Sequence, residues 1–387
     1  MLNDFDPVLL HIENIWQKNL TPAHGKPLGG WRNIIMQVGR VKLPYSFCAP
    51  NDKYFAGTQF YWDSYFTILG LVDSNRVDIA KNMVDNLCFL FTKFGIIPAR
   101  NSWTSLGRSQ PPLLTSMAFE IFDNKGADEI WMDKVMDIAK QEYSKVWMQT
   151  PRIYDKTGLS QYHPKYFSKF LTVFESGWDV SSRFKEETNN ILPVDLNCLL
   201  YQYETDFLTW AKRKEDARSE KKWQTALKNR KKAINNYFWH NNFYYDYNLE
   251  SASNSTLKTL AAFYPLWCGV ASPEQAAKCR AKLDVFEYAG GLATTEKLLP
   301  YSNQWDYPNG WAPLQYIVIE GLRKYGYTDD ADRLTQKWLE CNNKVFVKTG
   351  KLWEKYDVVN CEIGLRGSYP TQSGFGWTNG VFVRLSK

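Results

Sequence analysis

Apolar residues recur at helical spacing over most of the chain. In the segment 77–94, for example, Ile79, Met83, Leu87 and Phe91 fall on one face of a helix. The same period predicts further helices over residues 112–122, 130–146, 194–212, 223–237, 312–325 and 331–348. The pattern therefore predicts an all-α protein.

The segments between the predicted helices are rich in Gly, Pro, Asn and aromatic residues, and they contain nearly every polar motif. Residues 243–247 (Phe-Tyr-Tyr-Asp-Tyr) are typical of a short hairpin strand. Helix pairs joined by such loops suit a helical barrel with its site at one end, although an irregular helical bundle has the same periodicity. Because no Gly/Ser-rich linker divides the chain, we expect a single domain, 1–387.

Composition narrows the class of protein. Contents of 44% hydrophobic and 23% charged residues are typical of a soluble globular chain. The aromatic content of 16%, with 16 tryptophans, exceeds what packing usually needs and favours a cleft that binds a glycan. The net charge is +6, and basic residues gather in the segment 211–232. Acidic residues are interleaved there, so we interpret this segment as a solvated helix face rather than a nucleic-acid interface.

The spacing of the cysteines and the N-terminal residues indicate in which cellular compartment the protein is located. The seven cysteines are scattered and lack CxxC spacing, which indicates neither a zinc site nor a disulfide framework. The first residues include early acidic positions and no long apolar run, so we do not expect a signal peptide. No stretch has the length of a membrane span. We expect a cytoplasmic protein without metal, cofactor, nucleic-acid or membrane partner, and the sequence leaves its oligomeric state open.

The most informative motif is the segment 304–313, Gln-Trp-Asp-Tyr-Pro-Asn-Gly-Trp-Ala-Pro. It combines the indoles of Trp305 and Trp311 with the carboxylate of Asp306 and a tight Pro-Asn-Gly bend. A pyranose ring has apolar C–H faces and polar edges, so it needs flat aromatic faces beside fixed hydrogen-bonding groups. The segment therefore indicates carbohydrate chemistry.

A second motif is the segment 175–183, Glu-Ser-Gly-Trp-Asp-Val-Ser-Ser-Arg, which includes Gly177, Trp178, Asp179 and Arg183. Glycoside hydrolysis usually employs two carboxyl groups, one acid and one base or nucleophile. Asp179 lies beside an indole and, if shielded from water, keeps its proton near neutral pH as a general acid must. The alternative interpretation is a helix-capping Asp, a Ser-Ser turn and a structural Asp–Arg pair.

Glu354 lies in the run 353–357, Trp-Glu-Lys-Tyr-Asp, and is a candidate for the partner carboxylate from a different loop. The alternative is that Glu354-Lys355 is solvated surface charge. The run 374–380, Gly-Phe-Gly-Trp-Thr-Asn-Gly, includes Trp377 and looks too glycine-rich for an ordinary helix start. It lacks the Gly-Lys-Ser/Thr of a phosphate-binding loop.

Two further runs complete the set. Residues 61–66, Tyr-Trp-Asp-Ser-Tyr-Phe, repeat the Trp-Asp pairing in Trp62-Asp63, and three such pairs are hard to attribute to packed rings beside caps alone. Residues 108–112, Arg-Ser-Gln-Pro-Pro, supply donors near a stiff entry to the next helix. A plain helix start is the alternative for the second run.

Together these runs resemble the signature segments of the trehalase family of glycoside hydrolases. The matching segments are 61–65, 108–112, 175–179, 192–197, 304–313, 354–357 and 374–380. They come in the family's order from about residue 55 to residue 383, which is most of the chain.

The resemblance implies an (α/α)6 barrel with its site in the loops at one end, and hydrolysis of an α-glucosidic bond with inversion. By position, Asp179 matches the family's general acid and Glu354 its general base, and an inverting pair lies roughly 6.5–9.5 Å apart. Trehalose is the expected substrate, and the chemistry needs no metal. The expected substrate contacts are Trp62, Asp63, Arg108, Ser109, Gln110, Gly177, Trp178, Arg183, Trp305, Asp306 and Trp377.

Four positions depart from the family. Phe55 replaces an arginine, Ala99 an asparagine and Ser368 a glutamate, and an Arg-Pro-Glu segment is missing near residues 162–164. All four are expected substrate contacts, so another α-glucoside or an α-glycosyl glycerate is the alternative substrate. A sugar-binding protein without catalysis is the alternative of another class, and a phosphorylase is a third.

Overall fold

The computed structural model describes residues 5–24, 39–164, 173–184, 190–298, 303–364, 367 and 369–387. Its helices are α1 (Asp6–Asn19), α3 (Tyr61–Asp73), α4 (Val77–Phe94), α5 (Leu114–Asp123), α6 (Glu129–Glu142), α8 (Val194–Arg213), α9 (Ala217–Phe238), α10 (Tyr264–Trp267), α11 (Pro273–Arg280), α12 (Ala312–Lys324), α13 (Thr328–Thr349) and α14 (Gly376–Leu385). Short 3-10 or π turns are η1 (Trp103–Ser105), η2 (Tyr143–Trp147), η4 (Leu260–Phe263) and η5 (Leu283–Val285).

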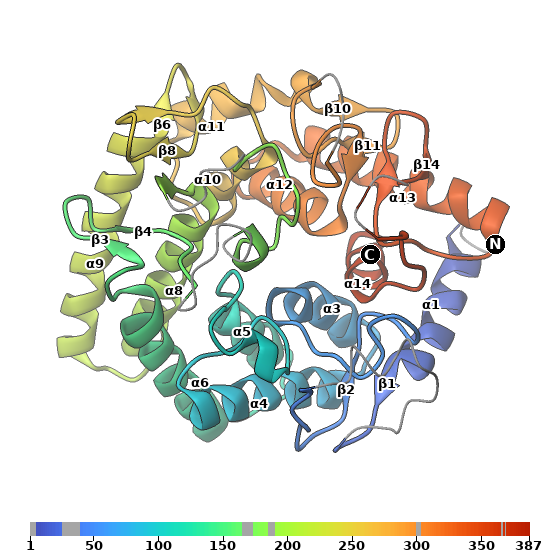
Figure 1. Ribbon diagram of the computed structural model, residues 1–387, viewed down its shortest axis with the longest axis horizontal. Coiled ribbons are helices and arrows are strands. Elements are labelled where there is room, and N and C mark those ends of the chain that lie inside the picture. Colours follow the sequence, from blue (N-terminus) through green and yellow to red (C-terminus); the bar gives the residue numbers. More distant parts are fainter. Residues whose placement is uncertain are drawn as a thin grey trace.

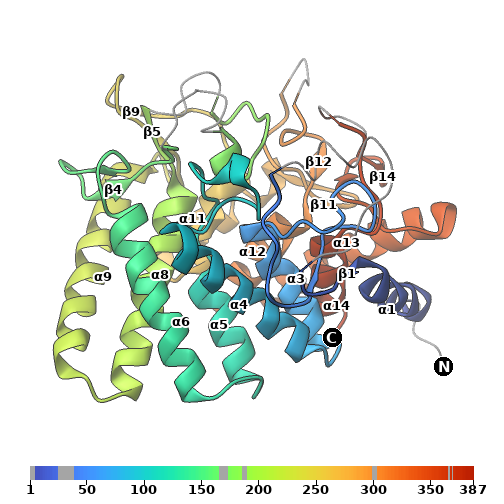
Figure 2. The same ribbon diagram turned by 60° about the horizontal axis from the view of Figure 1, so that its bottom comes forward.

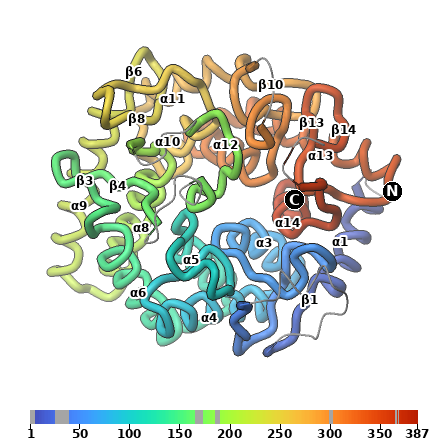
Figure 3. The backbone as a smooth tube through the Cα atoms, viewed as in Figure 1, coloured from blue at the N-terminus to red at the C-terminus, as the bar shows by residue number. Residues whose placement is uncertain are grey.

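The helices form a ring with an inner and an outer layer. In the inner layer α3, α5, α8, α10, α12 and α14 contact one another in this order, and α14 closes the ring against α3. Figure 1 shows these helices around the middle of the molecule, with α4, α6, α9 and α13 outside them. Because the chain passes round the ring once, α1 near one end of the chain lies beside α14 near the other (Figure 3).

Short strands and long loops gather at one end of the ring (Figure 2). All strand pairs are antiparallel. The pairs are β1 (Leu20–Thr21) with β2 (Phe47–Cys48), β3 (Ile153–Tyr154) with β4 (Leu159–Ser160), β6 (Trp239–His240) with β7 (Phe243–Tyr244), and β10 (Glu287–Tyr288) with β11 (Gly291–Leu292). Three-stranded sheets are β5 (Ile191–Leu192), β8 (Tyr247–Asn248) and β9 (Ser253–Asn254), and β12 (Asn309–Gly310), β13 (Tyr356–Asp357) and β14 (Glu362–Ile363).

The sheet of β12, β13 and β14 brings two distant motifs together. Asn309 pairs with Asp357 and Gly310 with Tyr356 across β12 and β13. The segment 304–313 therefore lies beside the run 353–357, although 39 residues separate them in the chain. Across this pairing Lys355 Nζ of one motif lies 4.9 Å from the centroid of the Trp311 ring of the other.

Helices α3 and α14 cross at close range. Gly70 of α3 faces Gly380 of α14, and a Cβ atom on Gly380 would overlap the carbonyl oxygen of Phe66. With no side chain on either glycine, the two backbones approach until they touch. Both helices are buried over nearly their whole length, so the crossing sets where α3 lies in the ring.

Helix prediction from periodicity agrees well with the structure. Helix α4 has the predicted bounds, and the helices predicted over 112–122, 130–146, 194–212, 223–237, 312–325 and 331–348 are confirmed within a few residues at most ends. The prediction of one hairpin strand over 243–247 is confirmed only for β7, which pairs with β6, because residues 245–246 are not in a strand and β8 starts at Tyr247 in a different sheet. The expectation for 374–380 is wrong, because residues from Gly376 onward form the buried helix α14.

The basic segment has the predicted surroundings. Half of the residues of α9 are exposed, and its buried side chains include Trp223 and Ile234, as expected of a solvated helix with one apolar face. All seven cysteines are buried and free. Among the described helices none has the length and apolar character needed to cross a membrane.

The α3–α14 crossing makes a prediction for stability. Gly380→Ala forces two packed backbones apart, so it should lower the free energy of unfolding at the upper end of the about 1–3 kcal/mol typical of overpacked cores. Gly350→Ala is the control, because that site has open space and only its left-handed backbone disfavours alanine, by about 1 kcal/mol. Denaturant unfolding followed by tryptophan fluorescence measures both, and equal losses would contradict the close crossing.

Candidate active site

A cavity of about 310 Å³ opens among the loops. Its volume is at the lower end of the range of small-molecule pockets. Of the residues expected from sequence, the lining includes Trp62, Asp63, Arg108, Gln110, Gly177, Asp179, Trp305, Glu354 and Trp377. Ser109, Trp178, Arg183 and Asp306 are not part of the lining.

Asp179 is a half-buried side chain in the wall of this cavity. Burial raises the pKa of its carboxyl group from 3.8 to about 8, the guanidinium of Arg108 opposes this shift, and the carboxylate of Glu354 adds to it. The group therefore keeps its proton near neutral pH. Asp179 can serve as a proton donor in this cavity.

Glu354 has a different environment in the same cavity. Its Oε2 accepts a hydrogen bond from Lys355 Nζ at 3.2 Å, and its Oε1 accepts one from the Tyr369 hydroxyl at 2.7 Å. Glu354 is 1% exposed and Lys355 is fully buried, so the interpretation of this pair as surface charge is excluded. A buried carboxylate with an adjacent ammonium is charge-compensated and can accept a proton.

A third carboxyl group belongs to Asp63 in the first turn of α3. Burial, and then the nearby carboxylates of Asp179 and Glu354, raise its pKa well above the usual value. Three acidic groups thus share one small cavity, which is costly for stability and typical of a functional site.

Gly177 and Gln110 position the neighbouring Trp62. The backbone of Gly177 has a φ of 75°, and a Cβ there would lie only 2.8 Å from Cε2 of Trp62. Only glycine satisfies both the left-handed conformation and this close approach. The Oε1 atom of Gln110 accepts a hydrogen bond from the Trp62 backbone N–H at 3.3 Å.

The tryptophans of the motifs form one packed cluster. The rings of Trp305 and Trp311 are parallel with centroids 3.9 Å apart, and Trp178 stacks on Trp305 at 5.6 Å. Trp62 and Trp377 contact Trp305 at 5.7 and 6.2 Å. The cluster serves as core, and all of its members except Trp178 also line the cavity.

Asp306 joins two of the motifs. Its carboxylate accepts hydrogen bonds from the Ser182 backbone N–H at 2.9 Å and from the Ser182 hydroxyl at 2.6 Å. The Ser181 hydroxyl and the Asn303 amide also donate to it, at 3.2 and 3.0 Å. Asp306 therefore acts on the loop that follows Asp179 and not on the cavity.

The segment 304–313 also hydrogen-bonds to the backbone of Asp179 and Val180. Gln304 Nε2 donates to the Asp179 carbonyl at 3.0 Å, and the Trp305 N–H donates to the Val180 carbonyl at 3.4 Å. Val180 has a φ of 59°, a left-handed conformation that strongly disfavours β-branched residues. Hydrogen bonds from Gln304 and Trp305 thus stabilise an unfavourable backbone conformation at Val180, directly after Asp179.

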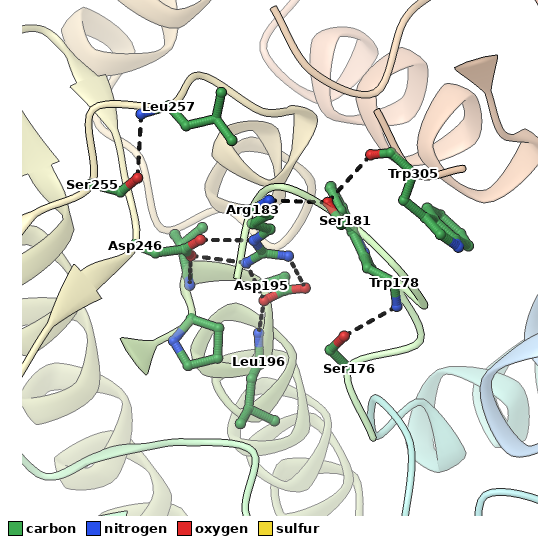
Figure 4. A network of polar contacts seen from close by, with 12 residues as sticks. Ser176, Trp178, Ser181, Arg183, Asp195, Leu196, Asp246, Ser255, Leu257 and Trp305 are labelled. Atoms are coloured by element: carbon green, nitrogen blue, oxygen red, sulfur yellow. Dashed lines mark hydrogen bonds and ion pairs between the residues drawn. The ribbon is translucent and has the colours of Figure 1, made fainter. Parts of the chain in front are cut away.

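Arg183 lies in a buried ion-pair network (Figure 4). Its guanidinium donates to both carboxylate oxygens of Asp195, at 2.7 and 2.8 Å, and to both of Asp246, at 2.7 and 2.8 Å. The side chain is 1% exposed and its charged end lies 4.6 Å from the Trp178 ring centroid. The alternative interpretation of the segment 175–183 predicted a structural Asp–Arg pair. Arg183 does form structural ion pairs, but with Asp195 and Asp246, which lie outside that segment.

Ser109 and Glu175 do not line the cavity, but they hydrogen-bond to each other behind it. Glu175 accepts hydrogen bonds from the Ser109 N–H at 2.8 Å, from Arg152 Nη2 at 2.5 Å and from the His163 N–H at 2.7 Å. The Ser109 hydroxyl donates to the Ile97 carbonyl at 2.8 Å. Glu175 is fully buried and its carboxylate connects the segments of Ser109, Arg152 and His163.

Several lining residues were not expected from sequence. These are Tyr54, Phe60, Arg100, Phe174, Tyr369 and Phe375; the lining also includes Trp311 of the segment 304–313 and Phe55, which the family resemblance points to. Lys355 is adjacent to Glu354 in the motif, and its contact with Glu354 depends on the burial of both side chains, which the run 353–357 does not indicate. Tyr369 and Arg100 carry no motif signal, because neither lies in a run with a distinctive spacing.

Of the four departures from the family pattern, Phe55 is part of the cavity lining, and residues 162–164 are not. Phe55 meets the ring of Tyr369 edge-on at 6.1 Å. Ala99 is buried directly behind the wall, where its N–H donates to the Arg108 carbonyl at 2.8 Å. Ser368 lies outside the described residues.

A family model described as Trehalase matches residues 32–170 and 165–387. The chain belongs to the trehalase family. It is 30% identical to the cytosolic neutral trehalase of Kluyveromyces lactis, over 98% of this chain and 63% of that protein. It is 32% identical to the periplasmic trehalase of Salmonella choleraesuis, over 97% of this chain and 72% of that protein. The chain therefore spans about two thirds of the length of these trehalases.

Solved structures agree with this membership. The neutral trehalase of Saccharomyces cerevisiae superposes with a TM-score of 0.79 and 30% identity, over 88% of this trehalase-family chain and 72% of that chain. A GH63 mannosylglycerate hydrolase from Thermus thermophilus shares the fold, with a TM-score of 0.70 and 17% identity over 98% of this chain and all of that chain.

The Arg183 network makes a prediction. Asp246→Asn removes one of the two carboxylates that compensate a buried guanidinium, so it should lower the free energy of unfolding by about 3–5 kcal/mol. Asp332→Asn is the matched control, because Asp332 is 71% exposed in its ion pair with Arg323. Denaturant unfolding compares the two variants, and a small, equal effect would show that the network does not stabilise the loop.

Proposed function

We propose that this chain is an inverting glycoside hydrolase that cleaves α,α-trehalose to two glucose molecules. The observation that supports this most is the pair of carboxyl groups in one cavity: Asp179 with a pKa of about 8, and Glu354 beside an ammonium. Inverting hydrolysis needs one protonated and one ionised carboxyl group. Membership of the trehalase family supports trehalose as the substrate.

In the proposed mechanism both groups act in one displacement. Asp179 gives its proton to the glycosidic oxygen as the bond from that oxygen to the anomeric carbon breaks, and the oxygen keeps the electron pair. Glu354 removes a proton from a water molecule that attacks the same carbon from the opposite face. The configuration is inverted, and proton exchange with solvent returns Asp179 to the acid form and Glu354 to the carboxylate. Lys355 and Tyr369 hold Glu354 in place by hydrogen bonds.

We divide the other expected residues by their position. Those that line the cavity are proposed to contact the sugar: Trp62, Asp63, Arg108, Gln110, Trp305 and Trp377. Ser109, Trp178, Arg183 and Asp306 are proposed as positioning residues, since each contacts the loops that carry the lining rather than the cavity. Gly177 is proposed to matter through the space that it leaves for Trp62.

The finer architecture and the compartment are also proposals. We propose that the two layers of helices are an (α/α)6 barrel formed by a single catalytic domain, 1–387. We propose a cytoplasmic location, which the seven buried free thiols support. The relatives include both cytosolic and periplasmic trehalases.

A second candidate is hydrolysis of a different α-glucoside by the same mechanism. Phe55 and Ala99 offer no hydrogen-bonding side chains where the family pattern has an arginine and an asparagine, and buried polar contacts to hydroxyls decide sugar discrimination. Release of glucose from a panel of α-glucosides, with and without added phosphate, separates trehalase, another glucosidase and a phosphorylase. Turnover of another glucoside without any cleavage of trehalose would refute trehalose as the substrate.

Carboxamide substitutions test the assigned roles. Asp179→Asn and Glu354→Gln should each lower kcat by on the order of 10²–10⁴-fold while substrate binding remains measurable by calorimetry. Glu362→Gln is the control, because Glu362 is exposed on the hairpin that follows Glu354. Turnover by Asp179→Asn at the rate of the unmodified chain would remove Asp179 from the role of acid.

The proton of Asp179 predicts the alkaline limb of the pH profile. The acid form is active, so kcat/KM should be maintained below about pH 8 and fall as the pH rises through that value, where Asp179 ionises. Arg108 opposes the raised pKa, so Arg108→Gln should move this limb to higher pH. Initial rates over a pH series measure both, and a limb that moved to lower pH would contradict the assignment.

A further inference from the structure

Two of the seven free cysteines meet where three elements pack together. Cys341 lies on α13, and Cys361 lies in the turn between β13 and β14. A Cβ atom on Gly290, in the turn between β10 and β11, would lie 2.7 Å from Cys341 Sγ and 3.1 Å from Cys361 Sγ. The Gly290 N–H also donates to the Val358 carbonyl at 2.7 Å. Both sulfur atoms therefore border the space that a side chain at Gly290 would fill, so they are close neighbours there.

The hairpin of residues 356–363, which carries Cys361, has a defined position against α13. Its strands β13 and β14 pair antiparallel. The ring of Tyr356 meets the ring of Trp338, one turn before Cys341 on α13, edge-on with centroids 5.4 Å apart. These contacts bring the two thiols together before any reaction, which reduces the reorganisation that a bond between them needs.

Cys361 is the more accessible of the two thiols. It is 8% exposed and lies between the exposed residues Asn360 and Glu362, whereas Cys341 is 1% exposed. The ammonium of Lys344 on α13 lies beside this turn and donates to the Asn360 carbonyl at 3.5 Å. A thiol near the surface and beside a cation is of the kind that reacts with small oxidants.

The two thiols also differ in acidity. A hydrogen bond from the Cys341 thiol lowers the pKa of the Cys361 thiol, burial opposes this, and the ammonium of Lys344 lowers it further. The carboxylates of Asp357 and Glu340 raise this pKa. The hydrogen bond with Cys361, together with burial, raises the pKa of Cys341. Cys361 is therefore the nucleophile of the pair, and Cys341 is the thiol that completes the bond.

A second pair of thiols is close together but lacks the access. Cys198 on α8 and Cys268, directly after α10, also form a hydrogen bond. Burial raises the pKa of Cys198 well above its usual value, and its side chain is fully buried. Proximity of two thiols therefore does not by itself make a reactive pair, and Cys198 with Cys268 serves as an internal control.

We propose that Cys341 and Cys361 are a redox modification site, at which a small disulfide such as oxidised glutathione converts the two thiols into an intramolecular disulfide bond. The Cys361 thiolate attacks one sulfur atom of the reagent, whose S–S bond breaks, and the first thiol leaves with the electron pair and takes up a proton. Cys341 then gives its proton to solvent and attacks the Cys361 sulfur, and the second thiol leaves in the same way. The protein loses two electrons and two protons, and one reagent disulfide becomes two thiols.

The bond links the hairpin 356–363 covalently to α13. The hairpin begins two residues after Glu354, and the Tyr356 hydroxyl accepts a hydrogen bond from the Trp353 N–H at 2.9 Å. A link at Cys361 therefore restrains the backbone next to the proposed base. Disulfides in a reducing compartment are typically transient and form or break with the redox state. Formation of the bond does not depend on the proposed hydrolysis.

Thiol trapping in the unmodified protein tests the proposal. The folded protein is incubated with oxidised glutathione, the remaining thiols are blocked with N-ethylmaleimide after unfolding, and the peptides are identified by mass spectrometry. Two of the seven thiols should escape blocking, in a peptide that links Cys341 to Cys361, and dithiothreitol should restore both. A protein that keeps all seven thiols, that ends with glutathione on Cys361, or that links Cys198 to Cys268 equally well would overturn the proposal.

Cys341→Ala separates the two chemical steps. Cys361 then has no partner thiol, so glutathione should remain attached to it as a mixed disulfide. Cys268→Ala is the matched control, because it removes one thiol of the other pair, and it should form the same Cys341–Cys361 link as the unmodified protein. Circular dichroism checks that both variants fold. A Cys361 thiol that stays free in folded Cys341→Ala would overturn its role as the nucleophile.

Hydrogen exchange measures the restraint on the hairpin. The backbone amides of residues 356–363 should exchange more slowly in the oxidised than in the reduced protein, because opening of the hairpin then also has to move α13. Helix α9 lies on the other side of the ring (Figure 1) and should exchange equally in both forms. Equal exchange of the hairpin amides in both forms would overturn the restraint.

Discussion

The candidate site depends on the hydrogen bonds between Asp306 and the loop that carries Asp179. A carboxylate that accepts from both the backbone and the hydroxyl of Ser182 fixes position and direction at once. Gln304 adds a bond to the Asp179 carbonyl itself. The segment 303–311 is thus a template for the loop, and Asp179 has its geometry because a distant part of the chain imposes it.

The segment 303–311 also contacts the other elements that line the cavity. Its strand β12 pairs with β13, which follows Glu354 directly. The Trp377 indole donates to the Glu354 carbonyl at 2.9 Å and so links that residue to α14. Helix α14 meets α3 at Gly380, and α3 carries Asp63. All three carboxyl groups therefore belong to one connected set of contacts, so a shift in one element displaces the others.

The helices could be predicted from sequence where one apolar face alternates with solvent, as in α4, because burial then repeats at the helical period. Helix α14 could not, since it is buried on all sides and has glycine where backbones touch. Sequence pattern is also insufficient to predict which side chains face the cavity.

Trp62-Asp63 and Trp305-Asp306 are alike in sequence, yet only the first presents its carboxylate to the cavity. Which side chains a loop turns inward depends on partners elsewhere in the chain, and Arg183 is fully engaged by two of them.

Val180 shows what this dependence means for the origin of the site. A β-branched residue in a left-handed conformation is disfavoured by about 1–3 kcal/mol, and nothing within its own tripeptide offsets that. The loop 176–184 is therefore not a portable module: transplanted to another scaffold without the segment 303–311, it would relax and turn Asp179 elsewhere. The functional unit is therefore the pair of segments together, even though the chain between them is more than a hundred residues long.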